Sequence, residues 1–339
     1  MNITSQPKWS FRTIAAVVPV VAALLVPAGA SASAGKVQGV RAQLDSGTLA
    51  VDGGDRANSV ALRLKAGDPT QIQVDAGDNG SADFSFARGA VEAIRVTMGN
   101  GRDSVRVDDA NGAFTDSIPT TIAGGNGDDS LNGGQGAETL RGGNGDDQVD
   151  GGRGNDRADL GRGDDTFVWD PGEGSDAIEG QSGSDAMVFN GANGDETVTL
   201  TANAGQLIFF RQPGSVTMST DDVERVDFNA LDGIDNVTVN DLTGTDVTQT
   251  DLDLAAALGG SASDGKVDNV IVNGTNGADT IHIDGTGSGA DVTGLASADS
   301  LEHADPGDRL SINTLAGADN VLATAVAGVL QVLVDGNPV

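Results

Sequence analysis

Five consecutive nine-residue units make up residues 124–168: GGNGDDSLN (124–132), GGQGAETLR (133–141), GGNGDDQVD (142–150), GGRGNDRAD (151–159) and LGRGDDTFV (160–168). Two inserted residues, Trp169 and Asp170, separate them from two weaker units, PGEGSDAIE (171–179) and GQSGSDAMV (180–188). A short repeat at a fixed period is typical of solenoids, in which each unit stacks on its neighbours.

Each position of the unit has a physical role. Glycines at positions one, two and four permit the positive φ angles and close backbone approach of a tight turn. The acid at position six directs its carboxylate into that turn. The residue at position eight is apolar and faces inward from a very short strand; these residues are Leu131, Leu140, Val149, Ala158, Phe167, Ile178 and Met187. The pattern predicts a flattened coil with two units per turn.

This stacking sorts the acids at position six into two columns. The first contains Asp129, Asp147, Asp165 and Asp185, and the second contains Glu138, Asp156 and Asp176. Successive coils lie ~4.8 Å apart, so the stacked carboxylates repel one another unless a cation lies between them. Calcium, with six or more oxygen ligands, suits carboxylates and turn carbonyls better than magnesium, which requires a tighter octahedron. The lack of Cys and the presence of only two His argue against zinc or copper.

The units resemble the G-G-x-G-x-D-x-U-x nonapeptide of RTX repeats, which occur in hemolysin-type calcium-binding proteins. The resemblance extends over residues 124–188. It implies a right-handed parallel β-roll that holds Ca²⁺ between its coils. A flexible Gly/Asp-rich linker is the alternative, but a linker does not keep a nine-residue phase. The resemblance assigns metal-binding positions to Gly125, Gly127, Asp129, Gly143, Gly145, Asp147, Gly152, Gly154, Asp156, Gly161, Gly163, Asp165, Asp176 and Asp185.

Two departures from the nonapeptide weaken part of the pattern. Glu138 replaces Asp, and its longer side chain is expected to disturb the site shared with Asp156. Pro171 and the two-residue insertion are expected to disturb the register beyond Phe167. We therefore expect the first column to be the better calcium binder.

A looser repeat flanks the tract at residues 35–123 and 189–339. It consists of an alternating strand, a turn containing G-x-D and a second alternating strand, as at 94–97 with 101–107, 225–229 with 233–239, 270–273 with 277–283, and 309–313 with 317–321. Period-two alternation predicts strands with one buried face. We predict further β-solenoid coils here, with a separate β-sandwich as the alternative for 189–339.

Some polar residues of this looser repeat have two interpretations. Asp235, Asp279 and Asp319 lack the neighbouring glycines, so we interpret them as solvated turn acids rather than as calcium ligands. The asparagines that recur at one position form either an inward amide ladder or ordinary turns; they are Asn229, Asn273 and Asn313.

The composition favours a thin, acidic, all-β structure. The 339 residues include 50 Gly, no Tyr and no Cys, and aromatic residues make up 3%. So little aromatic bulk suits stacked layers of small and β-branched residues. The formal net charge of −31 repels nucleic acid and anionic lipid and attracts cations, so calcium ions are the expected partner.

The N-terminus has the pattern of a secretory signal peptide over residues 1–34. Lys8 and Arg12 precede an apolar run from Ile14 to Val26, and a string of small residues follows Pro27. A membrane anchor is the alternative, but this run is shorter than the roughly 20 residues that span a bilayer. We therefore expect a secreted, extracellular protein with no membrane span after signal removal.

The sequence predicts a non-enzymatic protein. G-x-S-x-G, H-E-x-x-H and phosphate-loop motifs do not occur, and His282 and His303 are isolated. The alternative is a carbohydrate-active enzyme or carbohydrate-binding module on a β-helix, with a cell-surface or polysaccharide partner. An exposed aromatic stripe would support that alternative, but Trp169 is the one Trp beyond the predicted signal peptide.

Overall fold

The structure is a computed structural model that describes residues 32–33, 36–324 and 328–339. Apart from the short strand at 32–33, the predicted signal peptide at residues 1–34 lies outside the described residues. In the part of the chain that is described, no helix is long and apolar enough to cross a membrane.

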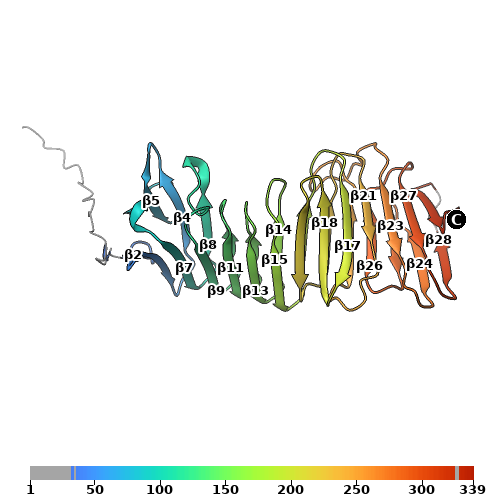
Figure 1. The fold of residues 1–339 in the computed structure, drawn as a ribbon, viewed down its shortest axis with the longest axis horizontal. Coiled ribbons are helices and arrows are strands. Elements are labelled where there is room, and N and C mark those ends of the chain that lie inside the picture. The colour runs from blue at the N-terminus through green and yellow to red at the C-terminus, as the bar shows by residue number, and fades with distance from the viewer. Residues whose placement is uncertain (1–31, 34–35, 325–327) are drawn as a thin grey trace, which may run out of the picture.

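The described residues form two long β-sheets that face each other along an elongated molecule (Figure 1). The first sheet has 16 strands in the order β1 (Ala32–Ser33), β2 (Arg41–Asp45), β3 (Thr48–Gly54), β7 (Ala93–Asn100), β9 (Thr120–Asn126), β11 (Glu138–Asn144), β13 (Arg157–Arg162), β15 (Ala177–Ser182), β19 (Val216–Asp221), β18 (Gln206–Gln212), β17 (Thr197–Asn203), β21 (Asn236–Val239), β23 (Asn269–Asn273), β27 (Arg309–Asn313), β29 (Gln331–Val334) and β30 (Asn337–Pro338).

The second sheet has 14 strands in the order β28 (Asn320–Thr324), β24 (Thr280–Gly285), β25 (Ala290–Thr293), β26 (Ala298–Glu302), β22 (Gln249–Asp253), β20 (Arg225–Asn229), β16 (Ala186–Asn190), β14 (Thr166–Trp169), β12 (Gln148–Asp150), β10 (Ser130–Asn132), β8 (Ser104–Asp108), β4 (Ser59–Lys65), β5 (Asp68–Ala76) and β6 (Phe84–Ala87). Two short 3₁₀ helices complete the described elements, η1 (Arg88–Ala90) and η2 (Asp109–Asn111).

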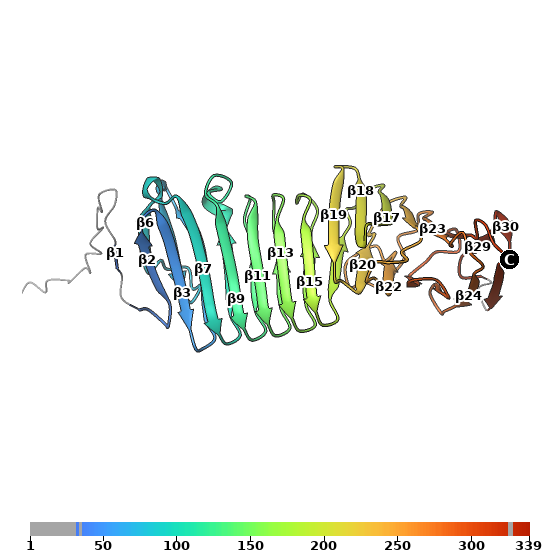
Figure 2. The ribbon, with the colours of Figure 1, turned by 60° about the horizontal axis from the view of Figure 1, so that its bottom comes forward.

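Along the repeat tract the chain alternates between the two sheets, and each return to the same sheet adds one parallel strand. Leu131 of β10 lies opposite Val149 of β12, two nonapeptides later. The strands of the first sheet follow one another from β3 to β15 in the same way (Figure 2). The predicted coil of two units per turn is therefore confirmed.

The two-residue insertion does not break the stack. Phe167 of β14 pairs with Met187 of β16 at a spacing of 20 residues, so the extra residues are absorbed in the turn that follows Trp169. The indole Nε1 of Trp169 closes this turn by donating to the carbonyl oxygen of Gly174 at 2.9 Å. The expectation that the register is disturbed beyond Phe167 is wrong, because the turn and not the ladder changes length.

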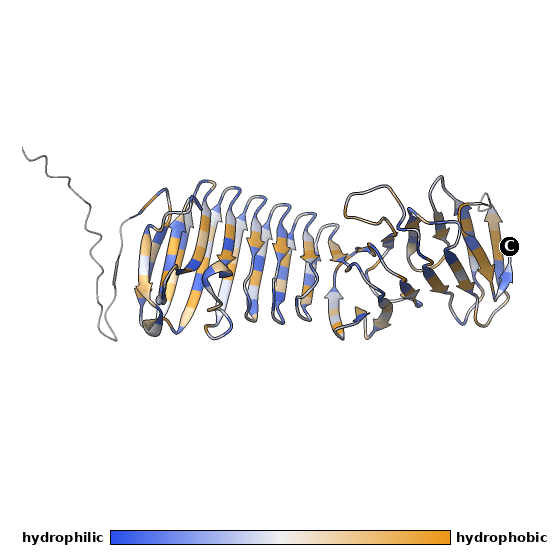
Figure 3. Cartoon of the chain, turned by 90° about the horizontal axis from the view of Figure 1, so that it is seen from above, coloured by the Kyte–Doolittle hydropathy of each residue, from blue (hydrophilic) through white to orange (hydrophobic). Residues whose placement is uncertain are grey.

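The core is a single apolar layer between the sheets. Apolar and polar residues alternate along the strands (Figure 3), and all seven position-eight residues are at most 1% exposed. The prediction that they face inward is thus confirmed. The largest aromatic group follows the tract, where Phe189 stacks on Trp169 with ring centroids 4.0 Å apart and also contacts Phe209, with centroids 4.4 Å apart.

The same two sheets continue into both flanks. In residues 189–339, β21, β23, β27 and β29 extend the first sheet in parallel, and β20, β22 and β26 extend the second. The C-terminal region is therefore more solenoid and not a separate sandwich. Antiparallel strands are inserted at β17–β19 and β24–β26, and antiparallel partners also close the ends at β2–β3 and β29–β30.

The asparagines of the looser repeat form amide ladders, but in two separate columns. Asn229 Nδ2 donates to Asn190 Oδ1 at 2.8 Å on the second sheet. On the first sheet Asn273 Nδ2 donates to Asn240 Oδ1 at 2.9 Å, and Asn313 Nδ2 donates to Asn273 Oδ1 at 2.8 Å. Side-chain amides thus bridge successive coils of the C-terminal region.

Replacing Gly143 by Ala tests the packing of coil on coil. Gly143 has a φ of +126°, and a Cβ atom there would overlap the carbonyl oxygen of Gly125 in the preceding coil. We expect Gly143→Ala to lower the free energy of unfolding by at least ~2 kcal/mol, because it adds a strained φ and a backbone clash. Urea denaturation in calcium-containing buffer, followed by far-UV circular dichroism, measures this loss.

Gly287→Ala is the matched control. Gly287 lies in the loop between β24 and β25, its φ lies outside the left-handed region, and no atom lies within 4 Å of a Cβ built there. Its free energy of unfolding should stay within about 0.5 kcal/mol of the unchanged protein. Equal losses in the two variants would contradict the role of the glycine in coil packing.

Candidate metal centre

The acids predicted to bind metal lie in the turns that connect the two sheets. Within the tract, an acid of the first column directly precedes each strand of the second sheet. In the first sheet, Asp156 and Asp176 directly precede β13 and β15, and Glu138 is the first residue of β11. All seven are 1–3% exposed: Asp129, Glu138, Asp147, Asp156, Asp165, Asp176 and Asp185. A buried carboxylate requires partners for its oxygens or a compensating cation.

In the first column each acid is held by the coil before it. The backbone N–H of Asp129 donates to Asp147 Oδ1 at 2.7 Å, and that of Asp147 donates to Asp165 Oδ1 at 2.7 Å. The N–H of Asp165 donates in turn to Asp185 Oδ1 at 2.8 Å. One oxygen of each of these carboxylates, from Asp147 to Asp185, is therefore satisfied by the main chain.

The first column is longer than the repeat tract. Toward the N-terminus the N–H of Asp103 donates to Asp129 Oδ1 at 2.7 Å, and the N–H of Asn58 donates to Asp103 Oδ1 at 2.6 Å. Toward the C-terminus the N–H of Asp185 donates to Glu224 Oε2 at 2.7 Å. The sequence analysis missed Asp103 and Glu224 as members of this column, although the G-x-D of residues 101–103 is a signal for the first.

The second column is built in the same way. The N–H of Glu138 donates to Asp156 Oδ1 at 2.7 Å, and the N–H of Asp156 donates to Asp176 Oδ1 at 2.7 Å. The backbone of Glu138 thus keeps its place in the ladder even though its side chain is longer than that of Asp.

The second oxygen of most column acids has no hydrogen-bond partner. These buried atoms are Asp103 Oδ2, Asp129 Oδ2, Glu138 Oε1, Asp147 Oδ2, Asp156 Oδ2, Asp165 Oδ2, Asp176 Oδ2 and Asp185 Oδ2. Each of these oxygens is therefore a candidate ligand for a cation.

Glycine at position one leaves room beside these oxygens. A Cβ atom at Gly142 would overlap both Asp147 Oδ2 and the carbonyl oxygen of Leu160 in the next coil. An anionic oxygen and a carbonyl oxygen thus face the same space. An all-oxygen donor set with no sulfur or imidazole fits a hard cation such as Ca²⁺.

The predicted glycines lie in the turns that carry these acids or at the ends of the strands that lead into those turns. All eight have positive φ, from +75° to +132°: Gly125, Gly127, Gly143, Gly145, Gly152, Gly154, Gly161 and Gly163. Each is packed against the backbone of the preceding coil, where a Cβ atom would overlap a carbonyl oxygen or lie 2.5 Å from it.

Burial changes the acidity of the column acids. Desolvation, the largest cause, and then the neighbouring carboxylates raise the pKa of Asp147 and Asp185 to about 7 against the hydrogen bonds that lower it. The same causes raise the pKa of Asp129 and Asp176 to about 6, and that of Asp156 to about 9. Without a cation, burial therefore moves the protonation of these acids toward neutral pH.

A third run of acids was missed by the sequence analysis. The N–H of Glu196 donates to Asp235 Oδ1 and that of Asp235 to Asp268 Oδ1, both at 2.7 Å, and the N–H of Asp268 donates to Asp308 Oδ1 at 2.9 Å. The four acids are 1–2% exposed. This run continues the second column beyond the inserted strands β17–β19.

The interpretation of the looser-repeat acids as solvated is wrong for two of the three. Asp235 is 1% exposed and Asp279 is 9% exposed, while Asp319 is half-buried. In the turn of Asp235, Leu231 stands at the place of the second glycine and has a positive φ of +70°. Because a non-glycine residue fills this position, the glycine pattern did not identify the turn.

An arginine separates the two parts of the second column. Arg211 Nε donates to Glu196 Oε1 at 2.7 Å, and its Nη2 bonds to the same oxygen. Its guanidinium carbon also lies 5.6 Å from the ring centroid of Trp169. Glu196 thus receives a cation from the chain itself, unlike the acids of the repeat tract.

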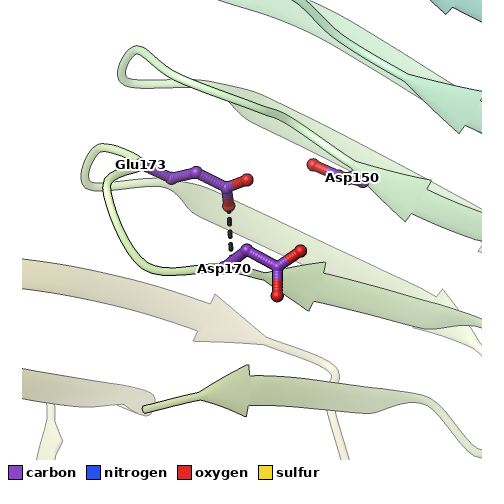
Figure 4. Close-up of side chains that lie close together, drawn as sticks. All are labelled: Asp150, Asp170 and Glu173. Atoms are coloured by element: carbon purple, nitrogen blue, oxygen red, sulfur yellow. Dashed lines mark hydrogen bonds between the residues drawn. The ribbon is translucent and has the colours of Figure 1, made fainter. Parts of the chain in front are cut away.

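Figure 4 shows a separate acid group at the turn after β14. One carboxylate oxygen from each of Asp150, Asp170 and Glu173 lies within 4.8 Å of the others. These acids already accept hydrogen bonds, such as Gly152 N–H to Asp150 Oδ1 at 2.8 Å and Asp170 N–H to Glu173 Oε2 at 2.8 Å. Asp170 is exposed, so this group lacks the buried, unpaired oxygens of the columns.

The fold and the acid columns together define a parallel β-roll assembled from nonapeptide turns. Residues 120–149 and 132–167 match the family described as RTX calcium-binding nonapeptide repeat (4 copies). The resemblance inferred from the sequence is confirmed: residues 120–167 are RTX-type calcium-binding repeats. No curated protein is similar enough to this chain to match it.

The raised pKa values of the column acids predict how the calcium-free protein responds to pH. A carboxyl group whose folded pKa of about 7 exceeds its unfolded value near 3.9 holds more protons when folded. Its stabilisation is complete below the unfolded pKa and is lost as the pH rises through the folded pKa. We therefore expect the calcium-free protein to be more stable at pH 5 than at pH 8, as measured by urea midpoints after calcium removal.

Saturating calcium provides the comparison. Because metal binding requires ionised carboxylates, the calcium-bound protein should lose this preference for acid and be at least as stable at pH 8 as at pH 5. If the calcium-free protein became more stable as the pH rose, the assignment of raised pKa values to the column acids would be wrong.

Proposed function

We propose that this protein is an exported calcium-binding structural or surface protein in which Ca²⁺ between the coils drives folding. One observation carries this proposal. The two columns of the tract present buried carboxylate oxygens without a hydrogen-bond partner, in turns that match calcium-binding repeats. Desolvated and unpaired anionic oxygens are costly unless a cation compensates them.

Different residues would supply the oxygen ligands of the ions in the two columns. In the first column the acids of adjacent coils, such as Asp147 and Asp165, would supply carboxylate oxygens, and Leu160 would supply a carbonyl oxygen beside Asp147. In the second column Asp156 and Asp176 would act in the same way. Bound Ca²⁺ supplies the positive charge that lets neighbouring carboxylates stack. The backbone N–H ladder fixes each carboxylate while its second oxygen faces the ion.

Binding free energy becomes folding free energy when the site does not exist in the unfolded chain. The carboxylates come together only when the coils stack, so the acids repel one another in the absence of the ion. Extracellular calcium modules bind with a Kd of about 10⁻⁴–10⁻³ M. Such an affinity would keep the tract loose inside a cell and fold it after export, which the N-terminal signal pattern of residues 1–34 supports.

We also propose that the protein is not an enzyme. The carbohydrate alternative would need aromatic rings on a solenoid face, but Trp169 is 0% exposed and packs in the core. A groove on the outside of the second sheet is lined mainly by acids, amides and hydroxyls, together with Arg225, Val188 and Ala298, and no aromatic residue is among them. The described structure therefore favours calcium binding over carbohydrate binding.

Asp147→Asn tests the role of the unpaired oxygen. Asn keeps the oxygen that accepts the N–H of Asp129 but removes the charge of the second oxygen. We expect about a tenfold higher calcium concentration at the folding midpoint, in line with the loss of a metal-site contact. Calcium titration followed by far-UV circular dichroism measures the midpoint. The calcium-free variant should be no less stable than the unchanged protein, because it lacks one buried charge.

Asp116→Asn is the matched control, since Asp116 is an exposed acid outside the columns, with a 53% exposed side chain. It should leave the calcium midpoint within about twofold, as expected for a surface charge. The proposal would be refuted if the unchanged protein gained no β signal on addition of calcium.

A further inference from the structure

The acid at the N-terminal end of the second column departs from the others. Glu138 Oε2 accepts the N–H of Gly134 at 2.9 Å, whereas Oε1 is buried without a partner. A Cβ atom at Gly136 would lie 2.6 Å from Glu138 Oε1 and would overlap the carbonyl oxygen of Thr115. The longer side chain thus carries its free oxygen toward residue 115, in the preceding coil.

The preceding coil presents two further oxygens to the same place. Thr115 is 3% exposed, and its hydroxyl Oγ1 lies against the Glu138 carboxylate without a hydrogen bond of regular geometry. A Cβ atom at Gly134 would overlap Thr115 Oγ1 and lie 3.4 Å from Asp109 Oδ2, and Asp109 Oδ1 is also buried and unpaired. A buried threonine hydroxyl without a regular hydrogen bond is unusual, because it is both a donor and an acceptor.

These oxygens do not belong to nonapeptides. Asp109 lies in η2 and Thr115 lies in the loop that follows it, before the first unit begins at Gly124. Among the described residues, neither Glu138 nor Asp109 forms an ion pair with Lys or Arg within 4.0 Å, in contrast to Glu196 with Arg211. Two carboxylates and one hydroxyl therefore face a glycine-lined space without a resident cation.

We propose that Glu138, Thr115 and Asp109 form an additional calcium site that caps the N-terminal end of the second column. The inference rests on the proposed calcium-binding function and adds a site made from one repeat acid and two residues outside the repeats. Carboxylate, hydroxyl and carbonyl oxygens are the ligands that Ca²⁺ accepts, and its flexible coordination tolerates an irregular set that Mg²⁺ would not. In this arrangement, the longer side chain of Glu138 adds a calcium site at the end of the second column and does not disturb the column.

The proposal reverses the expectation for one substitution. Glu138→Asp brings the second unit closer to the nonapeptide pattern, so a spoiled repeat would bind calcium better after this change. A capping site requires the longer side chain to reach Thr115 and Asp109. Glu138→Asp should therefore weaken one calcium ion at least about tenfold, the usual minimum for a lost contact at a metal site.

The experiment is equilibrium dialysis of the full chain against radioactive calcium, which gives both the number of ions and their affinities. Thr115→Val and Asp109→Asn should each weaken or remove one ion per chain, as Glu138→Asp does, while Thr115→Ser should bind like the unchanged protein. The matched controls are Thr121→Val, on the outward face of β9, and Asp116→Asn. Both should leave the number of ions unchanged.

The outcomes separate this inference from the proposed function. If Glu138→Asp bound calcium as well as or better than the unchanged protein, or if Thr115→Val neither lost an ion nor bound one more weakly, the capping site would be refuted while the columns stood. If the unchanged protein bound no calcium, both proposals would fail. Far-UV circular dichroism at saturating calcium identifies a misfolded variant. If Thr115→Val or Asp109→Asn misfolds, the calcium affinities of Thr115→Ser and Glu138→Asp are compared instead. The capping site then requires normal binding in Thr115→Ser and weakened binding in Glu138→Asp.

Discussion

The structure depends on one repeated contact, the hydrogen bond from a backbone N–H to the carboxylate of the next coil. From Asn58 to Glu224 this contact joins successive turns at 2.6–2.8 Å. It aligns the turns, but it also brings buried anions into a row. Backbone donors satisfy only one oxygen of each acid, so the alignment that orders the coils creates a demand for positive charge between them.

The chain meets this demand differently in different places. Asp75 is fully buried, and both of its oxygens have partners: Arg63 bonds to it at 2.9 Å, and the N–H groups of Asn79 and Gly80 also donate. Arg211 gives Glu196 a positive partner at Oε1, while Glu196 Oε2 stays without a hydrogen-bond partner. Within the tract no arginine bonds to a described column acid, and the second oxygens stay unpaired. The charge balance of the tract, and of described column acids outside it such as Asp103 and Asp235, therefore depends on the surroundings.

The nine-residue period was sufficient to predict the coil of two units, the burial of position eight and the two acid columns, because each depends on residues within one or two units. The period did not predict the continuation of the ladder to Asp235, since Leu231 adopts the positive φ that the pattern assigns to glycine. The repeat pattern also did not predict that β17–β19 are inserted antiparallel strands. The contact of Arg211 with Trp169 joins residues 42 positions apart, a separation at which local periodicity carries no information.

The number of residues in each coil, compared with the distance between coils, has a mechanical consequence. One coil takes up 18 residues, the spacing between Asp129 and Asp147, yet it advances the molecule by only ~4.8 Å, the distance between neighbouring strands. The same 18 residues fully extended would reach about 60 Å. Ordering the repeats therefore shortens this part of the chain more than tenfold relative to its contour length. The stacking of the tract therefore sets the distance between the segments before and after it.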